Sequence, residues 1–179
     1  DVQAQMSCKI SNSGHFAKQI KNNDGTTVLS GATFQTLCPS GWYGRDEGAR
    51  SSCLKCFTGR YSDDRGLKHG GECKLCKEGR YSDEMGVFSL LGCKTCMPGK
   101  SNPLLGMPSA KNCRSCVKGK YQYLPGKASC DNCPAGLFQP NITQIGCIEC
   151  NPGLYSELSG AHTCSRCRTG YFQEAYGSV

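Results

Sequence analysis

Apolar positions in this chain are isolated, and the most regular of them recur inside a repeated phrase. The longest apolar cluster is "VFSLL", Val87 to Leu91, which is too short to predict a membrane-spanning segment. The phrase is C-x2-G-x-aromatic, and a glycine placed in this way before an aromatic residue is typical of a short β-hairpin. The sequence therefore predicts hairpins at the aromatic positions, which are Tyr43, Tyr61, Tyr81, Tyr121, Phe138, Tyr155 and Phe172, with Ser101 in the aromatic place once.

The hairpin phrases follow one another at a fixed period. C-x2-C pairs begin 20 residues apart from Cys53 to Cys113 and 17 residues apart from there to Cys164. A second glycine recurs five residues after the aromatic position, and only Thr143 replaces it. Such self-similarity indicates an array of small units. We expect three segments, namely residues 1–37 of unassigned fold, repeats with the 20-residue period over 38–116, and repeats with the 17-residue period over 117–179, the last of them incomplete.

Composition limits what can hold these units together. Leu, Ile, Val and Phe make up 29 of the 179 residues, too few for a conventional hydrophobic core. Cysteine contributes 16 residues, a density at which cross-links replace buried area in small extracellular modules. We therefore expect a small disulfide-rich, mostly β or irregular fold: an elongated tandem array of short disulfide-closed β-hairpin repeats with little hydrophobic core. Because no secretory leader precedes Asp1, we also expect a processed or excised product.

The cysteine spacing admits two interpretations, disulfides and zinc ligands. C-x2-C, sixteen residues and a second C-x2-C is also the spacing of a zinc ribbon. However, seven such pairs and two single cysteines do not divide into sets of four, and His15, His69 and His162 share no position in the repeat. The sequon Asn141-Ile142-Thr143 predicts an N-linked glycan in the secretory pathway, where disulfides form. These observations favour disulfides over zinc, and over a redox-active C-x2-C, which normally occurs once and beside a βαβ unit.

The stretch "CPSGWYGRDEGARSSCLKC" and its successors, from Cys38 to the end, resemble the ephrin-receptor-like cysteine-rich repeats, which are related to modules of tumour-necrosis-factor receptors. In that family the cysteine of the phrase bonds to the first cysteine of the next C-x2-C pair. The resemblance thus implies seven disulfides: Cys38 with Cys53, Cys56 with Cys73, Cys76 with Cys93, Cys96 with Cys113, Cys116 with Cys130, Cys133 with Cys147, and Cys150 with Cys164.

Cys8 and Cys167 are left without a partner in register. An unpaired thiol is a liability in an oxidising compartment, so we expect each to have a partner outside the visible loops. Cys167 could bond to a further repeat downstream, or it could bond to Cys8 of another copy, which would produce a head-to-tail fibre.

The physical reading of one repeat adds three expectations. The aromatic residue is expected to cover the disulfide of its own loop. The two residues inside each C-x2-C are expected to be the only hinge between units that stack in one direction. In residues 1–37, "NNDGTTV" predicts a hairpin turn at Asp24-Gly25.

Charge and side-chain type divide the array into two halves. Residues 53–120 hold 13 Lys and Arg against 6 Asp and Glu, whereas the remainder holds 8 of each, so the net charge of +7 lies in the first half. The residue after the phrase glycine changes in the same way. It forms a basic ladder, Arg60, Arg80, Lys100 and Lys120, and then an apolar ladder, Leu137, Leu154 and Tyr171, with Trp42 at the start. Either ladder could be a binding surface, or a solvated face and leucines packed on their own hairpins.

No constellation in the sequence indicates catalysis or a cofactor. The histidines are scattered, and the paired carboxylates Asp63-Asp64 and Asp83-Glu84 lie in predicted turns, where a solvated role is the simpler interpretation. Nucleic acid is not expected as a partner, because the basic residues lack interleaved free aromatics.

Two functions fit these features. The first is an extracellular structural or adhesive protein, whose rod is a building block of a cell-surface filament, stalk or matrix and binds copies of itself, other extracellular proteins or acidic glycans. The second is the stalk or ligand-binding region of a receptor ectodomain. The regularity of the repeats favours the first, because arrays that bind ligands usually diverge where the ligand touches them.

Overall fold

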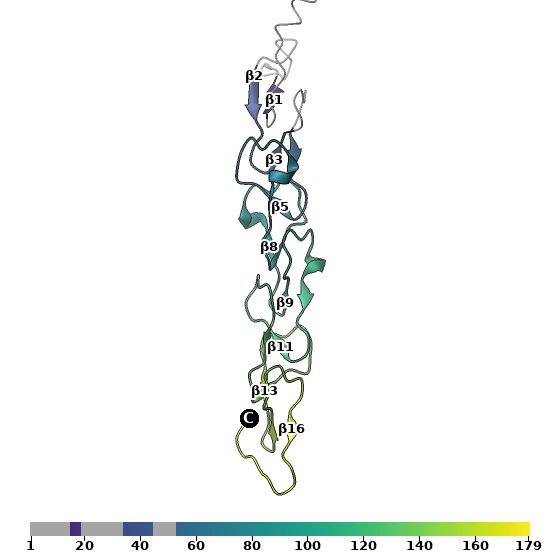
Figure 1. Ribbon diagram of the computed structural model, residues 1–179, viewed down its shortest axis with the longest axis vertical. Coiled ribbons are helices and arrows are strands. Elements are labelled where there is room, and N and C mark those ends of the chain that lie inside the picture. Colours follow the sequence, from purple (N-terminus) through teal and green to yellow (C-terminus); the bar gives the residue numbers. More distant parts are fainter. Residues whose placement is uncertain (1–14, 19–33, 45–52) are drawn as a thin grey trace, which may run out of the picture. The chain divides into compact units, whose positions relative to one another are not determined.

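Two-residue strands paired as antiparallel hairpins are the recurring element of the protein (Figure 1). The structure is a computed structural model that describes residues 15–18, 34–44 and 53–179. A longer hairpin joins β1 (His15–Lys18) to β2 (Phe34–Leu37). The shorter pairs are β3 (Trp42–Tyr43) with β4 (Leu54–Lys55), β5 (Arg60–Tyr61) with β6 (Lys74–Leu75), β7 (Arg80–Tyr81) with β8 (Lys94–Thr95), β9 (Lys100–Ser101) with β10 (Arg114–Ser115), β11 (Lys120–Tyr121) with β12 (Asp131–Asn132), β13 (Leu137–Phe138) with β14 (Ile148–Glu149), and β15 (Leu154–Tyr155) with β16 (Ser165–Arg166).

The phrase C-x2-G-x-aromatic builds each hairpin. Its glycine adopts a positive φ, as Gly119 does at +78°, and the two residues after the glycine form the first strand. The two residues inside the following C-x2-C form the second strand, and the amide of Cys133 closes the pair by donating to the carbonyl of Gly119 at 2.9 Å. The expectation that these two residues are a hinge is therefore wrong, because they are held in a strand.

We number the repeats from the cysteine of each phrase. They are 38–55, 56–75, 76–95, 96–115, 116–132, 133–149, 150–166 and 167–179, called repeats 1 to 8. The chain divides into two units, one of Asp1–Cys76 and Ser82–Cys93 and the other of Lys77–Tyr81 and Lys94–Val179. Each unit is considered by itself below.

In the described part of the chain, seven disulfides close repeats 1 to 7. They join Cys38 to Cys53, Cys56 to Cys73, Cys76 to Cys93, Cys96 to Cys113, Cys116 to Cys130, Cys133 to Cys147, and Cys150 to Cys164. These are the seven pairs that the family resemblance implies. The tandem disulfide-closed hairpins expected from the sequence are confirmed as the fold class.

In repeats 1 and 2 the aromatic residue of the phrase packs on the next repeat instead of its own. Tyr43 of repeat 1 clusters with Cys56 and Cys73, the disulfide of repeat 2. Tyr61 of repeat 2 clusters in the same way with Cys76 and Cys93 of repeat 3. For these two repeats the expectation that the aromatic covers the disulfide of its own loop is therefore wrong, because the ring reaches forward to the next repeat.

The same three backbone hydrogen bonds recur between most pairs of successive repeats. Between repeats 5 and 6, Gly119 donates to the carbonyl of Gln139 at 2.8 Å, Gln122 donates to Gln144 at 3.0 Å, and Thr143 donates back to Cys116 at 2.8 Å. The equivalent three bonds occur between repeats 1 and 2, 2 and 3, 4 and 5, 6 and 7, and 7 and 8. A repeat is thus incomplete alone, since part of its backbone pairs only with the next one.

The buried interior consists mainly of cystines and small polar groups. Among the described residues outside the disulfides, the buried apolar side chains are Tyr43, Tyr61 and Val87. This confirms the expectation of little hydrophobic core.

The two repeat lengths differ by one turn of 3₁₀ helix. Repeats 2, 3 and 4 contain η1 (Gly70–Glu72), η2 (Leu90–Gly92) and η3 (Ala110–Asn112), each just before the closing cysteine. In the described chain after Cys116 no such turn is present, and the disulfides there span 14 residues instead of 17. The three extra residues of the longer period therefore form this turn.

Candidate functional site

The residue after each phrase glycine, at which the sequence predicts two ladders, begins the first strand of its hairpin. Its side chain is half-buried in every repeat from Trp42 to Leu154, and it becomes exposed only at Tyr171. Arg60 belongs to the first unit, whereas Arg80, Lys100 and Lys120 belong to the second, as does the whole apolar ladder.

The basic ladder is not uniform in its contacts. The guanidinium of Arg60 donates to the carbonyl of Cys73 at 2.8 Å, so this side chain braces the loop that its own disulfide closes. Lys100 and Lys120 are half-buried and make no ion pair within the described part of the chain. At the start of the array, the ammonium of Lys55 lies 5.3 Å from the centre of the Trp42 ring, a cation–π contact across the hairpin.

The carboxylate pair Asp63-Asp64 forms an exposed ion-pair cluster with Lys74. The ammonium lies 2.6 Å from an oxygen of Asp63 and 2.9 Å from one of Asp64. The hydrogen bond from Lys74 lowers the pKa of the Asp63 carboxyl, and the two carboxylates raise the pKa of the Lys74 ammonium. The Asp63 carboxylate is therefore held in the charged form, which suits a surface brace and not a proton donor.

Asp83-Glu84 occupies the equivalent turn of repeat 3, and the hydroxyl of Ser82 donates to the carbonyl of Glu84 at 3.1 Å.

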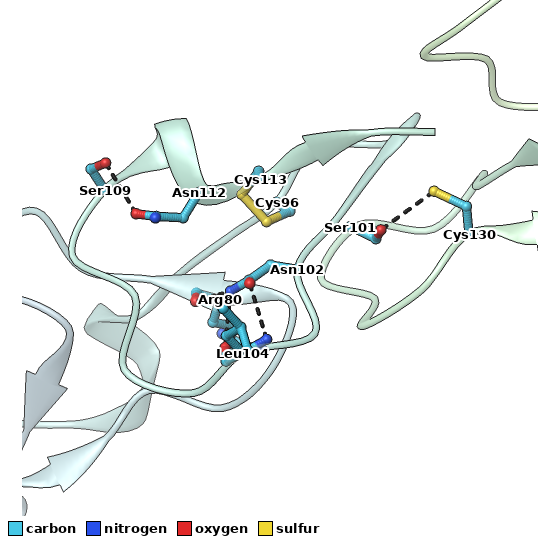
Figure 2. The surroundings of a disulfide bond; sticks show 9 residues. All are labelled: Arg80, Cys96, Ser101, Asn102, Leu104, Ser109, Asn112, Cys113 and Cys130. Atoms are coloured by element: carbon cyan, nitrogen blue, oxygen red, sulfur yellow. Dashed lines mark hydrogen bonds between the residues drawn. A yellow bond between two sulfur atoms is a disulfide. The ribbon is translucent and has the colours of Figure 1, made fainter. Parts of the chain in front are cut away.

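In repeats 2 to 7 a buried polar residue lies immediately after the aromatic position, and sequence reasoning missed it. This position is at most 6 % exposed and is occupied by Ser62, Ser82, Asn102, Gln122, Gln139 and Ser156. Asn102 shows its role (Figure 2): its amide nitrogen donates to the carbonyl of Arg80 at 3.3 Å and to that of Leu104 at 3.0 Å, and its oxygen accepts from the amide of Leu104. The side chain thus fastens its own loop to the preceding repeat. The sequence does carry a signal for this position, because none of these six residues is apolar.

Ser101, the exception at the aromatic position, keeps the forward contact. Its hydroxyl oxygen lies 3.4 Å from the sulfur of Cys130, which belongs to the disulfide of the next repeat (Figure 2). The smaller side chain therefore contacts the disulfide of the next repeat, as the rings of Tyr43 and Tyr61 do.

A cavity of about 460 Å³ adjoins the free thiol of Cys167. Tyr155, Tyr171 and Phe172 line it together with Glu157, Arg168 and Val179. Cys167 is half-buried and unpaired within the described chain, whereas Cys8 lies outside the described residues, as does the predicted turn at Asp24-Gly25. Tyr171 is 77 % exposed, while Leu137 and Leu154 are half-buried, so only the last member of the apolar ladder is open to solvent.

Metal ligation was the alternative use of the cysteines. Among the described residues no group of His, Cys, Asp or Glu side chains has the arrangement of a metal site. His69 lies 3.3 Å from a carboxylate oxygen of Glu72, His162 is exposed, and His15 lies in β1. The cysteines of the seven C-x2-C pairs serve as disulfide partners, with the exception of Cys167.

Two overlapping segments of the chain, residues 106–143 and 126–161, match the family described as tyrosine-protein kinase ephrin type A/B receptor-like. No curated protein matches the chain. The matched family is a cysteine-rich receptor repeat and not a catalytic fold, and together with the seven disulfides it indicates an extracellular location. In the described residues no helix is long and apolar enough to cross a membrane.

Proposed function

Since the chain contains ephrin-receptor-like cysteine-rich repeats, we propose that it is an extracellular structural or adhesive protein. In this proposal the array is a disulfide-stapled rod and a building block of a cell-surface filament, stalk or matrix. Its segments are the N-terminal residues 1–37, the long-period repeats of 38–116 and the short-period repeats of 117–179.

The observation that carries the proposal is the three-bond connection that recurs from repeat 1 to repeat 3 and from repeat 4 to repeat 8. An array whose neighbours share backbone hydrogen bonds, and whose loops are closed by disulfides, transmits force along the chain without a large core. The backbone connection repeats along each unit, so successive repeats differ mainly in the side chains on their loop surfaces. Such an array suits a spacer or a building block better than a single ligand pocket.

A second candidate is the stalk or ligand-binding region of a receptor ectodomain. The observation in its favour is that the matching family is described as receptor-like. A receptor stalk would stay a separate particle, whereas a building block would associate with copies of itself.

The ladders supply the proposed contacts of the rod. Lys100 and Lys120, which have no acidic partner in the described chain, would face acidic glycans or an acidic neighbour. Arg60 is less available, because its guanidinium is engaged with Cys73. The apolar ladder would form a lateral contact, centred on the exposed ring of Tyr171.

The ends of the rod would join through cysteine. A disulfide between Cys167 of one copy and Cys8 of the next would be a heterologous contact, and such a contact propagates into a fibre instead of closing. The half-buried free thiol of Cys167 beside an open cavity is compatible with this role.

Negative-stain imaging of the native material tests the proposed function. We expect filaments or laterally associated rods, and isolated particles attached to membrane would favour the receptor stalk. Non-reducing peptide mapping of the same material tests the covalent end contact. A peptide joining Cys8 to Cys167 is expected, and Cys167 found bonded to a further repeat would rule out the covalent fibre.

A further inference from the structure

We propose that Asn141 carries an N-linked glycan in the folded protein, and that Thr143 occupies a glycine position because the acceptor sequence needs its hydroxyl. The inference rests on the extracellular location of the proposed function, since the transfer occurs in the secretory pathway.

The backbone of Thr143 is the first observation. Its φ is +63°, and among the described residues it is the one non-glycine with a positive φ. The equivalent residues of the adjacent repeats, Gly126 and Gly160, have φ values of +72° and +85°. A β-branched side chain is disfavoured in this left-handed region, where glycine has no penalty. Some other requirement must therefore select threonine here.

The surroundings of Thr143 prevent its backbone from relaxing. Its amide donates to the carbonyl of Cys116 at 2.8 Å, which is one of the three bonds that tie repeat 6 to repeat 5. Its carbonyl oxygen lies so close to Gly99 of repeat 4 that a Cβ on that glycine would overlap it. The array thus imposes the left-handed conformation at this position whatever residue occupies it.

The folded loop makes no use of the threonine hydroxyl. Within the part of the chain that the structure describes, this hydroxyl has no hydrogen-bond partner. A hydrogen bond to nearby backbone, an ordinary reason for a threonine in a turn, is therefore not the explanation. The residue is half-buried with its methyl group beside Gly99 of repeat 4, but glycine holds the equivalent place in repeats 5 and 7, so the packing does not require a side chain there. The N-x-S/T acceptor sequence, in which Thr143 stands two residues after Asn141, does account for it.

Asn141 is placed where a sugar can extend into solvent. Its side chain is exposed and has no partner in the described chain, while its backbone amide donates to the side-chain oxygen of Gln139 at 3.2 Å. The equivalent residues of repeats 5 and 7, Leu124 and Leu158, are 39 % and 77 % exposed. This position therefore faces solvent in successive repeats, and a glycan on it displaces no packed side chain.

The modification is a substitution at an anomeric carbon. The donor is a lipid-linked diphosphate oligosaccharide, and the transferase is supplied by the secretory pathway. The Asn141 amide nitrogen forms a bond to the anomeric carbon, and the bond from that carbon to the diphosphate oxygen breaks. The electron pair leaves with the lipid diphosphate, and the amide loses one proton to a base.

Native material provides the direct test. Treatment with peptide N-glycosidase in heavy-oxygen water converts a glycosylated asparagine into a labelled aspartate. We expect the peptide containing Asn141 to carry this label, and an unlabelled, unmodified Asn141 peptide would overturn the proposal. If the same material contains reduced cysteines instead of disulfides, the extracellular function fails; if it contains disulfides and an unmodified Asn141, only the present inference fails.

Two variants secreted from eukaryotic cells separate the glycan from the backbone conformation. Asn141→Gln and Thr143→Gly both abolish the glycan, but only Thr143→Gly relieves the left-handed threonine. We expect the melting temperature of Thr143→Gly to exceed that of Asn141→Gln by about 3 °C, a shift typical of relief of one strained residue in a chain of this size. Thr143→Ser should keep the glycan. Equal melting temperatures of the two unglycosylated variants would overturn the role assigned to Thr143.

Transplanting the acceptor into neighbouring loops is the matched control. The double change Leu158→Asn and Gly160→Thr writes N-S-T into repeat 7, and we expect it to add a second glycan. The corresponding change Leu124→Asn and Gly126→Thr writes N-P-T into repeat 5, because Pro125 stands between them, and proline at this place blocks glycosylation. Failure of the repeat 7 variant to gain a glycan would show that this loop position is not accessible to the transferase.

Discussion

At the residue scale, three glycines differ in two properties: whether the backbone has a positive φ, and whether neighbouring atoms leave room for a Cβ. Gly119 has a φ of +78°, and a Cβ there would overlap the carbonyl oxygen of Gly160, two repeats further on. Gly153 has the same φ but no neighbouring atom within 4 Å of its ideal Cβ. Gly146 has neither feature. The close contact between repeat 5 and repeat 7 can therefore be tested by glycine-to-alanine substitutions, each of which adds one methyl group.

We predict that alanine substitutions at these glycines lower the free energy of unfolding in graded steps. Gly146→Ala should have little effect, Gly153→Ala should cost about 1 kcal/mol for the left-handed alanine, and Gly119→Ala should cost roughly 3 kcal/mol because steric overlap adds to that conformational cost. Denaturant unfolding with the disulfides intact measures all three. Equal losses for Gly119→Ala and Gly153→Ala would show that repeats 5 and 7 do not touch.

Also at the residue scale, the cluster of Asp63, Asp64 and Lys74 predicts a pH dependence. The hydrogen bond from Lys74 places the folded-state pKa of Asp63 below its ordinary value of 3.8. A carboxyl with a lowered folded pKa contributes stability above its unfolded pKa, and that contribution is lost as the pH falls through the folded pKa.

We therefore predict that Lys74→Met returns the pKa of Asp63 toward 3.8 and reduces this acid-side loss of stability. Carboxyl-carbon NMR titration of Asp63 measures the shift directly. Lys68→Met is the control, because Lys68 is an exposed lysine of the same loop that makes no ion pair in the described chain. If both variants shifted the pKa of Asp63 equally, the shift would come from the net positive charge of the loop and not from the ion pair with Lys74.

At the scale of the element, the 3₁₀ turn is an insertion that the hairpin does not require. Repeats with and without the turn have the same two-residue strands, and their phrase cysteines bond to the same place in the next C-x2-C. The conserved connection to the next repeat involves the phrase and the loop glycine and not the turn. The loop length is therefore free to change by this unit of three residues.

We predict that deletion of η3, Ala110–Asn112, leaves repeat 4 folded. The disulfide from Cys96 would then span 14 residues, as in repeats 5 to 7. The smaller loop changes the entropic contribution of the disulfide by only about 0.2 kcal/mol. Deletion of residues 127–129 is the control, because it removes the Lys127 carbonyl that accepts from Asn102 and the Ser129 carbonyl that accepts from Gln122.

Intact mass and peptide mapping under non-reducing conditions measure both deletions. The first should keep all seven disulfides, and the second should lose the bond between Cys116 and Cys130 or exchange it. Loss of the native disulfides in the η3 deletion would show that the turn is needed for the long repeats to fold.

At the scale of the whole molecule, each repeat contributes little to a common core. A compact domain of this length has a radius of gyration of ~16 Å. Because the repeats bury cystines and polar side chains locally, we predict a radius well above that value and a rod-like profile in small-angle X-ray scattering. A radius near the compact value would exclude the stacked array.

The sequence by itself determined the repeat, its period and the hairpin at each phrase. These features are local, since a glycine and two cysteines at fixed spacing decide where a short loop turns and closes. The pairing of Cys38 with Cys53 and its six successors came from the family resemblance, and the structure has the same pairs. The polar residue after each aromatic was visible in the sequence too, but its burial was not.

Only the tertiary structure decided how one repeat meets the next. A fixed period is compatible with any offset between neighbours, so it could not reveal that Tyr43 covers the disulfide of repeat 2 instead of its own. For the same reason it could not show that the pair inside C-x2-C is a strand and not a hinge, or that Arg60 is engaged with Cys73. The left-handed backbone of Thr143 also belongs here, because bonds to other repeats impose it. Each of these features depends on the offset between repeats, which is determined by hydrogen bonds between residues that lie in different loops.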